Sequence, residues 1–277
     1  MKKIIIRLAD SFIKTPAGKV WLRGLSRFYE FFRYRNSLSA HVIANNELKD
    51  LFSDLTVRSG FFKGLNYPAF ESFGSSLYPK LSGNYESELF QTFEKFTMEG
   101  IPNFIDIGCA EGYYAVGVAK AVANCHVIAF DIDENARELC TNMAKCNGVS
   151  DWVEVKVACS DEWLGEQKFA DNTLLLCDCE GFEFELFTSE NIPNLKNCNL
   201  IIEMHPFINR KIKPTLTALF KETHNITIVS SKDDKRKIFD LNETYLSLTP
   251  LQKNIIVQEG RPFTMDWLIA TSKQSNL

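Results

Sequence analysis

Two apolar runs in the second half of the chain end in acids and an imidazole. Asp178 and Glu180 follow the first run, and Glu203 and His205 close the second. Histidine has a reference pKa near 6.5, so it can accept a proton at neutral pH while carboxylates orient it. A lone histidine is more often structural, but this one comes directly after an acid at a strand end. We expect base chemistry here, with His205 as the base and the three carboxylates orienting a substrate or the imidazole.

The same side chains suggest a metal-assisted variant. Mg²⁺ on Asp178, Glu203 and His205 would have the oxygen ligands that this ion prefers and would lower the pKa of a hydroxyl group. We consider this variant less favoured than the metal-free base and assign no metal ligand. The variant predicts that EDTA abolishes activity.

A glycine-containing turn forms the second centre of chemistry. In the segment FIDIGCAEGY an apolar strand runs into Gly108, and a five-residue turn ends at Gly112, where a helix begins. Glycine allows the backbone to turn sharply and to approach a ligand, and the helix N-terminus offers free N–H groups. The spacing is not the GxGxxG of dinucleotide-binding proteins, which disfavours an NAD-dependent oxidoreductase.

Asp131 is the third element, at the carboxyl end of the next strand and 23 residues after Gly108. An acid at this place suits two hydrogen bonds to ribose hydroxyls. The alternative is a helix cap, a role that Asp133 can fill instead. The turn and the acid together predict a ligand that contains adenosine.

Short apolar runs and helical stretches alternate after residue 101, which predicts an α/β domain with a parallel sheet covered on both faces. The last strand could return antiparallel to its neighbour. We expect strands over 103–107, 126–131, 152–157, 173–178, 199–204, 225–230 and 265–271. We expect helices over 113–122, 134–146, 182–187, 214–222 and 250–257.

Four segments, FIDIGCAEGYYAVG, VIAFDID, LLLCDCEGFEFELF and LIIEMH, together resemble class I S-adenosylmethionine-dependent methyltransferases. Within that class they look most like FkbM-type enzymes, which mostly O-methylate sugars, glycans and natural products. The resemblance covers residues 81–271, and GNYESEL at 83–89 is similar to the family's "YE…EL" helix start. It implies a Rossmann-like, doubly wound sheet of seven mostly parallel strands.

The resemblance also implies the cofactor site. Gly108, Ala110 and Gly112 would line the methionine end of S-adenosylmethionine, and Asp106 would order the loop. Asp131 would hold the ribose, and Ile132 would pack on the adenine. The residues expected to bind the cofactor are Tyr85, Glu86, Asp106, Gly108, Cys109, Ala110, Gly112, Tyr113, Asp131, Ile132, Ser160 and Asp178.

Composition excludes several classes of protein. The chain has 277 residues, of which 45% are hydrophobic, and its glycines and prolines show no period, which excludes a disordered or repeat protein. Its apolar runs are too short to span a bilayer, and Arg7 and Asp10 interrupt any signal-peptide core, so we expect a cytoplasmic protein. Eight cysteines without a CxxC pair indicate free thiols.

The charge is uneven. Residues 1–40 carry nine Lys or Arg against two acids, whereas the rest of the chain is acidic, which disfavours a nucleic-acid partner. Lys19, Arg23 and Arg27 form a stripe at helical spacing beside aromatic residues. One interpretation is a helix packed on the main domain with a solvated basic face. The other is a surface that contacts anionic lipid at the inner membrane face.

The sequence therefore predicts a basic helical extension over 1–80 and a methyltransferase domain over 81–277. The expected acceptor is a small molecule or glycan that is methylated on a hydroxyl group. The alternatives are a methyltransferase with a protein or lipid-linked acceptor, and a noncatalytic S-adenosylmethionine-binding sensor or partner subunit. The sequence contains no signal for an oligomeric state.

Overall fold

The computed structural model describes residues 46–98, 100–261 and 263–274, and the chain divides into two units after Lys49. The basic arm and its predicted helix lie outside the described residues. The larger unit, Asp50–Leu277, includes residues 50–80, which the sequence analysis assigned to the extension.

Seven strands form one sheet in the order β3-β2-β1-β4-β5-β7-β6. The first five strands pair in parallel, and β7 runs antiparallel to both β5 and β6. The predicted class I methyltransferase fold, with seven mostly parallel strands, is therefore confirmed, and the structure shows that the last strand, whose direction the sequence left open, is antiparallel. The strands are β1 (Asn103–Ile107), β2 (His126–Phe130), β3 (Val153–Lys156), β4 (Leu174–Cys177), β5 (Asn199–Met204), β6 (His224–Ser230) and β7 (Asp266–Ser272).

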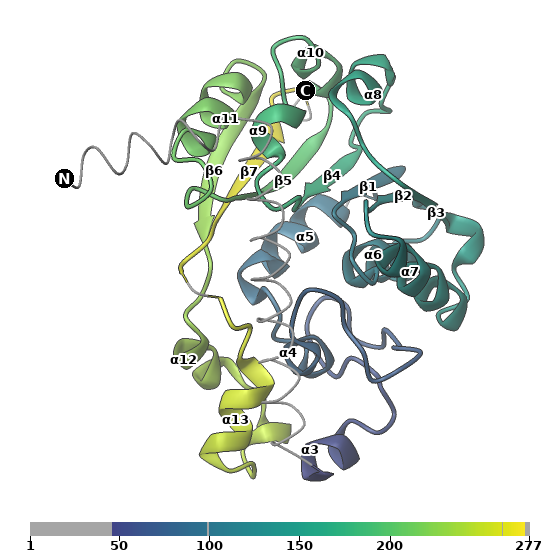
Figure 1. Cartoon of the computed structure of the whole chain (residues 1–277), viewed down its shortest axis with the longest axis vertical. Coiled ribbons are helices and arrows are strands. Elements are labelled where there is room, and N and C mark those ends of the chain that lie inside the picture. Colours follow the sequence, from purple (N-terminus) through teal and green to yellow (C-terminus); the bar gives the residue numbers. More distant parts are fainter. Residues whose placement is uncertain (1–45, 99, 262, 275–277) are drawn as a thin grey trace, which may run out of the picture. The chain divides into compact units, whose positions relative to one another are not determined.

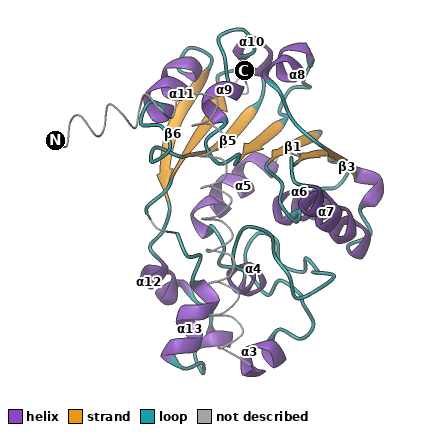
Figure 2. Cartoon of the chain, in the orientation of Figure 1, coloured by secondary structure: helices purple, strands orange, loops and turns teal. Residues whose placement is uncertain are grey.

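Helices cover both faces of this sheet. Figures 1 and 2 show α8, α9, α10 and α11 on one side and α5, α6 and α7 on the other. The helices of the sheet layers are α5 (Phe90–Thr97), α6 (Tyr113–Ala121), α7 (Glu134–Cys146), α8 (Asp161–Glu166), α9 (Glu183–Leu186), α10 (Ile192–Leu195) and α11 (Ile212–Phe220). The other α-helices are α3 (Asn46–Leu51), α4 (Leu77–Ser82), α12 (Asp234–Lys237) and α13 (Pro250–Val257).

The core explains why the central strands read as continuous apolar runs. Every residue of β4 and β5 is buried, because helices cover both faces of these strands. The edge strands β3 and β6 include exposed residues. Four short 3₁₀ helices complete the described chain: η1 (Ser87–Leu89), η2 (Ser150–Trp152), η3 (Ile238–Asp240) and η4 (Glu243–Tyr245).

Three helix predictions were imprecise, and the first of these helices, α6, ends at Ala121 rather than at Val122. The helix expected from residue 214 begins at Ile212, because Pro214 is tolerated in the first turn, where its missing N–H has no helical partner. The helix expected over 182–187 is shorter, at Glu183–Leu186. No helix among the described residues is long and apolar enough to cross a membrane.

The sheet has its topological switch between β1 and β4. The chain leaves β1 through α6 on one face and leaves β4 through α9 and α10 on the other (Figure 2). Ligands of open α/β sheets bind beyond the carboxyl ends of the strands at such a point. The turn that begins at Gly108 and the acids from Asp178 onward both follow these strand ends.

Candidate active site

The turn after β1 has an unusual backbone. Gly108, Ala110 and Gly112 have φ values of 91°, 49° and 94°. A Cβ on Gly108 would lie 1.8 Å from the carbonyl oxygen of Asp178, so no other residue fits. The N–H groups of Gly108 and Cys109 donate to the carbonyl of Phe130, at 2.8 and 2.9 Å. The turn is thus held against β2 and β4, and the open N-terminus of α6 follows it.

Asp131 connects the end of β2 to this turn. Its Oδ2 accepts the Ala110 N–H at 2.9 Å, and its Oδ1 accepts the Asp133 N–H at 2.9 Å. Burial raises the pKa of Asp131, partly offset by these N–H groups. The N-cap of α7 is Asp133, as predicted, and Ile132 between them is 82% exposed. A carboxylate beside an exposed apolar side chain has the chemistry that a ribose and its adenine require.

Asp106 is fully buried in β1 below the turn. Burial raises its pKa to about 8, and the Ala115 N–H partly opposes the shift. Its expected roles in ordering the loop and in binding the cofactor stay predictions.

Three other predicted cofactor residues have structural contacts. Cys109 and Tyr113 are buried, and the Tyr113 ring packs edge-on against Tyr85 with 5.5 Å between centroids. Ser160 is the N-cap of α8, where its side chain accepts the Trp163 N–H at 3.1 Å. Their contact with a cofactor stays a prediction.

Glu111, inside the turn, belongs to a group that the sequence analysis missed. Its carboxylate accepts hydrogen bonds from Lys80, from Ser72 Oγ at 2.8 Å, from Tyr67 Oη at 3.1 Å and from the Phe73 N–H at 3.1 Å. Burial alone would raise the pKa of Glu111, but the charge of Lys80 outweighs it and the pKa is lowered. We call Tyr67, Ser72, Lys80 and Glu111 the Lys80–Glu111 cluster.

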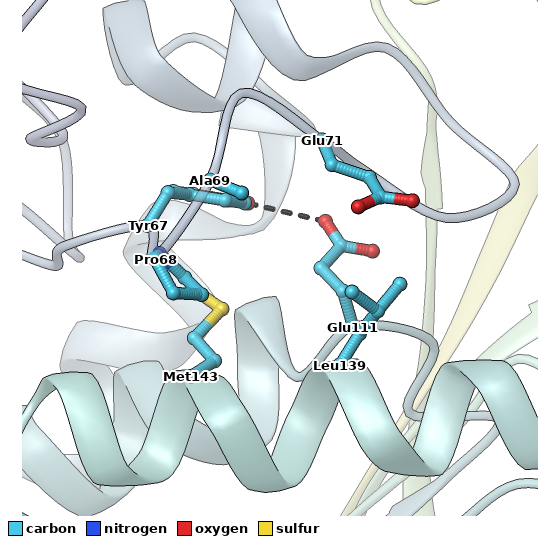
Figure 3. Close-up of a pocket in the computed structure, with 7 residues that line it drawn as sticks. All are labelled: Tyr67, Pro68, Ala69, Glu71, Glu111, Leu139 and Met143. Carbon is cyan, nitrogen blue, oxygen red and sulfur yellow. Dashed lines mark hydrogen bonds between the residues drawn. The ribbon is translucent and has the colours of Figure 1, made fainter.

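This cluster fixes the segment around residues 67–73 over the turn. Figure 3 shows the Tyr67 hydroxyl directed at Glu111, at the edge of a small cavity. The cavity is lined by Tyr67, Pro68, Ala69, Glu71, Glu111, Leu139 and Met143. The turn is therefore held from α4 and from the segment before it, as well as from the sheet.

The four predicted catalytic residues lie together. Nε2 of His205 is 3.6 Å from Asp178 Oδ1 and 3.5 Å from both Glu180 Oε2 and Glu203 Oε2. The His205 side chain is 2% exposed, whereas that of Glu180 is 54% exposed. An imidazole and three carboxylates therefore meet where β4 and β5 end.

A fourth carboxylate holds the imidazole from its other side. Glu183 Oε1 lies 2.9 Å from His205 Nδ1 and also accepts the N–H groups of Cys179 and Gly181, at 3.3 and 3.2 Å. The sequence analysis missed Glu183, although it comes three residues after Glu180 at the start of a helix. We call Asp178, Glu180, Glu183, Glu203 and His205 the His205 cluster.

The turn that presents this cluster is strained. Glu180 has a φ of 52° and Gly181 one of 99°. A non-glycine residue in this region costs about 1–3 kcal/mol and persists where the surroundings hold it. Ala110 and Glu86, also predicted site residues, share this conformation, with φ values of 49° and 48°.

Arg261 joins the His205 cluster to a second acidic group. Its guanidinium pairs with Glu203, with Glu86 and with Glu259, the last at 3.0 Å. Glu86 also accepts a hydrogen bond from the Tyr114 hydroxyl. Burial raises the pKa of Glu86 to about 7, although Arg261 opposes the shift. Arg261 stands far from every motif in the chain, and no sequence signal marked it.

Electrostatics divide the carboxyl groups of the His205 cluster. Burial and the nearby Glu203 raise the pKa of Asp178 well above its usual range. Burial acts the same way on Glu203, but Arg261 outweighs it and lowers that pKa. Burial lowers the pKa of His205, but Glu183 and the other carboxylates outweigh it, so the net shift is upward.

One part of the cluster also has the donors of a metal site. Asp178, Glu203 and His205 each offer one ligand atom, and these atoms lie within 4.8 Å of one another. The other part of the site has the features expected for a ligand that contains adenosine. The turn from Gly108 to Gly112, the N-terminus of α6 and Asp131 lie beside the switch point of the sheet.

Comparison with known proteins identifies the family of this chain. The family described as "Methyltransferase domain" matches residues 102–244, and no curated protein matches the sequence. A precorrin-6y C5,15-methyltransferase from Geobacter metallireducens is 12% identical, with 69% of this chain and 90% of that chain covered and a TM-score of 0.47. The METTL16 methyltransferase domain is 14% identical, with 68% of this chain and 66% of that chain covered and a TM-score of 0.44.

A geranyl diphosphate methyltransferase solved in complex with S-adenosylmethionine is 13% identical, with 67% of this chain and 86% of that chain covered and a TM-score of 0.37. Such low identities show no acceptor. The family match spans more than half of the chain and contains the turn, Asp131 and the His205 cluster. The chain belongs to the methyltransferase-domain family and is an S-adenosylmethionine-dependent methyltransferase.

Proposed function

We propose that the enzyme methylates a hydroxyl oxygen of a sugar, glycan or natural-product acceptor. The observation that carries this proposal is the His205 cluster, which places proton-accepting groups beside the cofactor turn. The two are in direct contact, because Gly108 packs against the carbonyl of Asp178. A hydroxyl group must lose its proton during methyl transfer, and a positioned base contributes about 10²–10⁴-fold to such a rate.

The bound cofactor would supply an activated methyl group on a cationic sulfur. The turn from Gly108 to Gly112 would hold its methionine end, and Asp131 would hold its ribose. His205 would accept the hydroxyl proton at Nε2, while Glu183 holds the imidazole at Nδ1. Asp178 and Glu180 would orient the acceptor through its hydroxyl groups. Aligning the two reactants is the larger part of such catalysis.

Exposed apolar side chains beside the cluster support a ring-shaped acceptor. Phe207 is 54% exposed, and its ring centroid lies 5.7 Å from that of His205 and 6.0 Å from that of Phe263. Phe182 and Ile208 are also exposed. Apolar faces next to a few convergent polar groups are typical of small-molecule sites. They would pack on the flat face of a sugar or polyketide ring while the carboxylates accept hydrogen bonds from its hydroxyl groups.

The test is the formation of S-adenosylhomocysteine with panels of sugar, glycan and phenolic acceptors. We expect release that depends on a hydroxyl acceptor and that falls about 10²–10⁴-fold in His205→Ala. His126→Ala, a change of an exposed histidine, is the matched control and should keep full activity. Methylation of nitrogen or carbon only, or an active His205→Ala enzyme, would contradict the proposal.

A further inference from the structure

The His205 cluster gathers more carboxyl groups than it has cations to pair with them. Four carboxylates surround one imidazole, and Arg261, the cation that reaches Glu203, is shared with two further carboxylates. Buried carboxylates are ordinarily paired with a cation or bound to a metal. An additional cation would therefore complete the cluster.

Two oxygens of the cluster, Asp178 Oδ1 and Glu183 Oε2, are buried acceptors without a hydrogen-bond partner among the described residues, and the first of them faces the imidazole. Asp178 Oδ1 lies 3.6 Å from Nε2 of His205. Glu203 Oε2 and Glu180 Oε2 lie 3.5 Å from the same nitrogen. All three separations exceed the 2.7–3.2 Å of an N–H···O hydrogen bond, so the four atoms converge without bonding to one another.

Glu183 determines what Nε2 presents to these oxygens. A carboxylate accepts, so Nδ1 carries the proton that lies between His205 and Glu183. In the neutral imidazole Nε2 then directs its lone pair at the carboxylates. A carboxylate that holds the far nitrogen of an imidazole is the usual support of a metal-binding histidine. Glu183 is itself fixed by two backbone N–H groups and is fully buried.

The spacing of the converging atoms suits a common ion. With metal–ligand bonds of about 2.0–2.2 Å, adjacent ligand atoms are about 2.8–3.1 Å apart in an octahedron and about 3.3–3.6 Å apart in a tetrahedron. The two separations from His205 Nε2, 3.5 and 3.6 Å, match the tetrahedral case, and all three ligand atoms lie within 4.8 Å of one another. Mixed imidazole and carboxylate donors suit Zn²⁺ or Mn²⁺ better than Mg²⁺.

We propose that Asp178 Oδ1, Glu203 Oε2 and His205 Nε2 bind a divalent cation of the Zn²⁺ or Mn²⁺ type, with Glu183 as the positioning residue. The proposal rests on the proposed function for its chemistry and changes one role in it: His205 becomes a ligand. The acceptor hydroxyl would occupy the open position, where the ion lowers its pKa. Glu180 would take the proton, the oxygen–methyl bond would form, and the sulfur would keep the electron pair of the broken bond.

The experiment uses the full chain freed of metal with EDTA and titrated calorimetrically with Zn²⁺ or Mn²⁺ alone. We expect one ion per chain and at least tenfold weaker binding in Asp178→Asn and His205→Ala. Glu183→Gln keeps an acceptor for Nδ1 but loses the charge, and should weaken binding about 10–100-fold. Glu222→Gln, at an exposed acid, should bind as the wild type does. X-ray absorption of the zinc-loaded protein should show one imidazole ligand.

Three results would overturn the proposal: no saturable binding of either ion, wild-type affinity in His205→Ala, or displacement of the ion by S-adenosylmethionine. The last result would identify the cluster as the pocket of the cofactor's own positive charge. Activity separates the two proposals. Full methyl transfer in EDTA would support the proposed function and contradict the cation site. Ion binding without methyl transfer to any hydroxyl acceptor would support the cation site and contradict the proposed function.

Discussion

The Lys80–Glu111 cluster and the His205 cluster differ in how far their carboxyl groups are paired. In the Lys80–Glu111 cluster one carboxylate meets one ammonium and three further donors, so its charge and its hydrogen bonds are satisfied. In the His205 cluster four carboxylates share one imidazole, and two buried oxygens have no hydrogen-bond partner within the described part of the chain. The first cluster has the features of a structural clamp, and the second those of a site that a ligand completes.

The clamp should dominate stability. Lys80→Met leaves the Glu111 carboxylate buried without its cation, and breaking such a pair costs about 3–5 kcal/mol. Urea unfolding monitored by circular dichroism measures the loss. Lys232→Met removes a partly exposed partner of Asp240 and should cost less than about 1 kcal/mol. Equal losses in the two variants would contradict the assignment of the clamp.

The next largest loss of stability is expected where the turn after β1 contacts the His205 cluster, at Gly108 and the carbonyl of Asp178. Gly108→Ala drives a Cβ into the carbonyl of Asp178, whereas Gly148→Ala meets no atom within 4 Å, although both positions have positive φ. Gly148→Ala should lose about 1–2 kcal/mol from backbone strain. Gly108→Ala should lose about 1–3 kcal/mol more and should also lose cofactor binding, as calorimetry would report. Similar losses in both variants would show that the contact with Asp178 has no energetic role.

Below the turn, Asp106 should make stability depend on pH. Its folded pKa of about 8 lies above the ordinary value of 3.8, so between these values the folded state binds more protons than the unfolded state. The free energy of unfolding should therefore fall as the pH rises through this window, by at most about 1.4 kcal/mol per pH unit. Asp106→Asn should flatten the decline. An unchanged slope in that variant would refute the assignment.

The smallest effect on stability is expected in the His205 cluster. Burial and Glu203 already favour the neutral form of Asp178 by raising its pKa, so Asp178→Asn in the metal-free protein should leave the free energy of unfolding within about 1 kcal/mol of wild type or raise it. Glu111→Gln is the same chemical change, carboxylate to amide, in the Lys80–Glu111 cluster. It should lower the free energy of unfolding several times more than Asp178→Asn does. Equal losses in these two variants would erase the distinction between the clusters.

The fold followed from the sequence because its determinants are local. Continuous apolar runs predicted the central strands, and the bounds expected for β1, β5 and α7 match those of the structure. Asp133 was predicted as the cap of α7 because capping depends on the residues next to the helix. Short α8 and α10, with six and four residues, are too brief to show a helical period.

Part of the site could not be predicted, because its partners meet only in three dimensions. Asp178, Glu180, Glu203 and His205 were recognised because strand ends gather at one edge of a parallel sheet. Lys80 reaches Glu111 from 31 residues away, and Arg261 reaches Glu203 from 58 residues away. No periodicity or motif encodes contacts of this kind.

The central claim is that the turn from Gly108 to Gly112 and Asp131 bind S-adenosylmethionine, and calorimetry with the full chain tests it directly. We predict one cofactor per chain and affinity that falls about 10–100-fold in Asp131→Ala, the loss of hydrogen bonds to a charged group. Asp133→Ala removes only the cap of α7 and should keep wild-type affinity. No binding at millimolar cofactor, or equal affinity in wild type and Asp131→Ala, would contradict the claim.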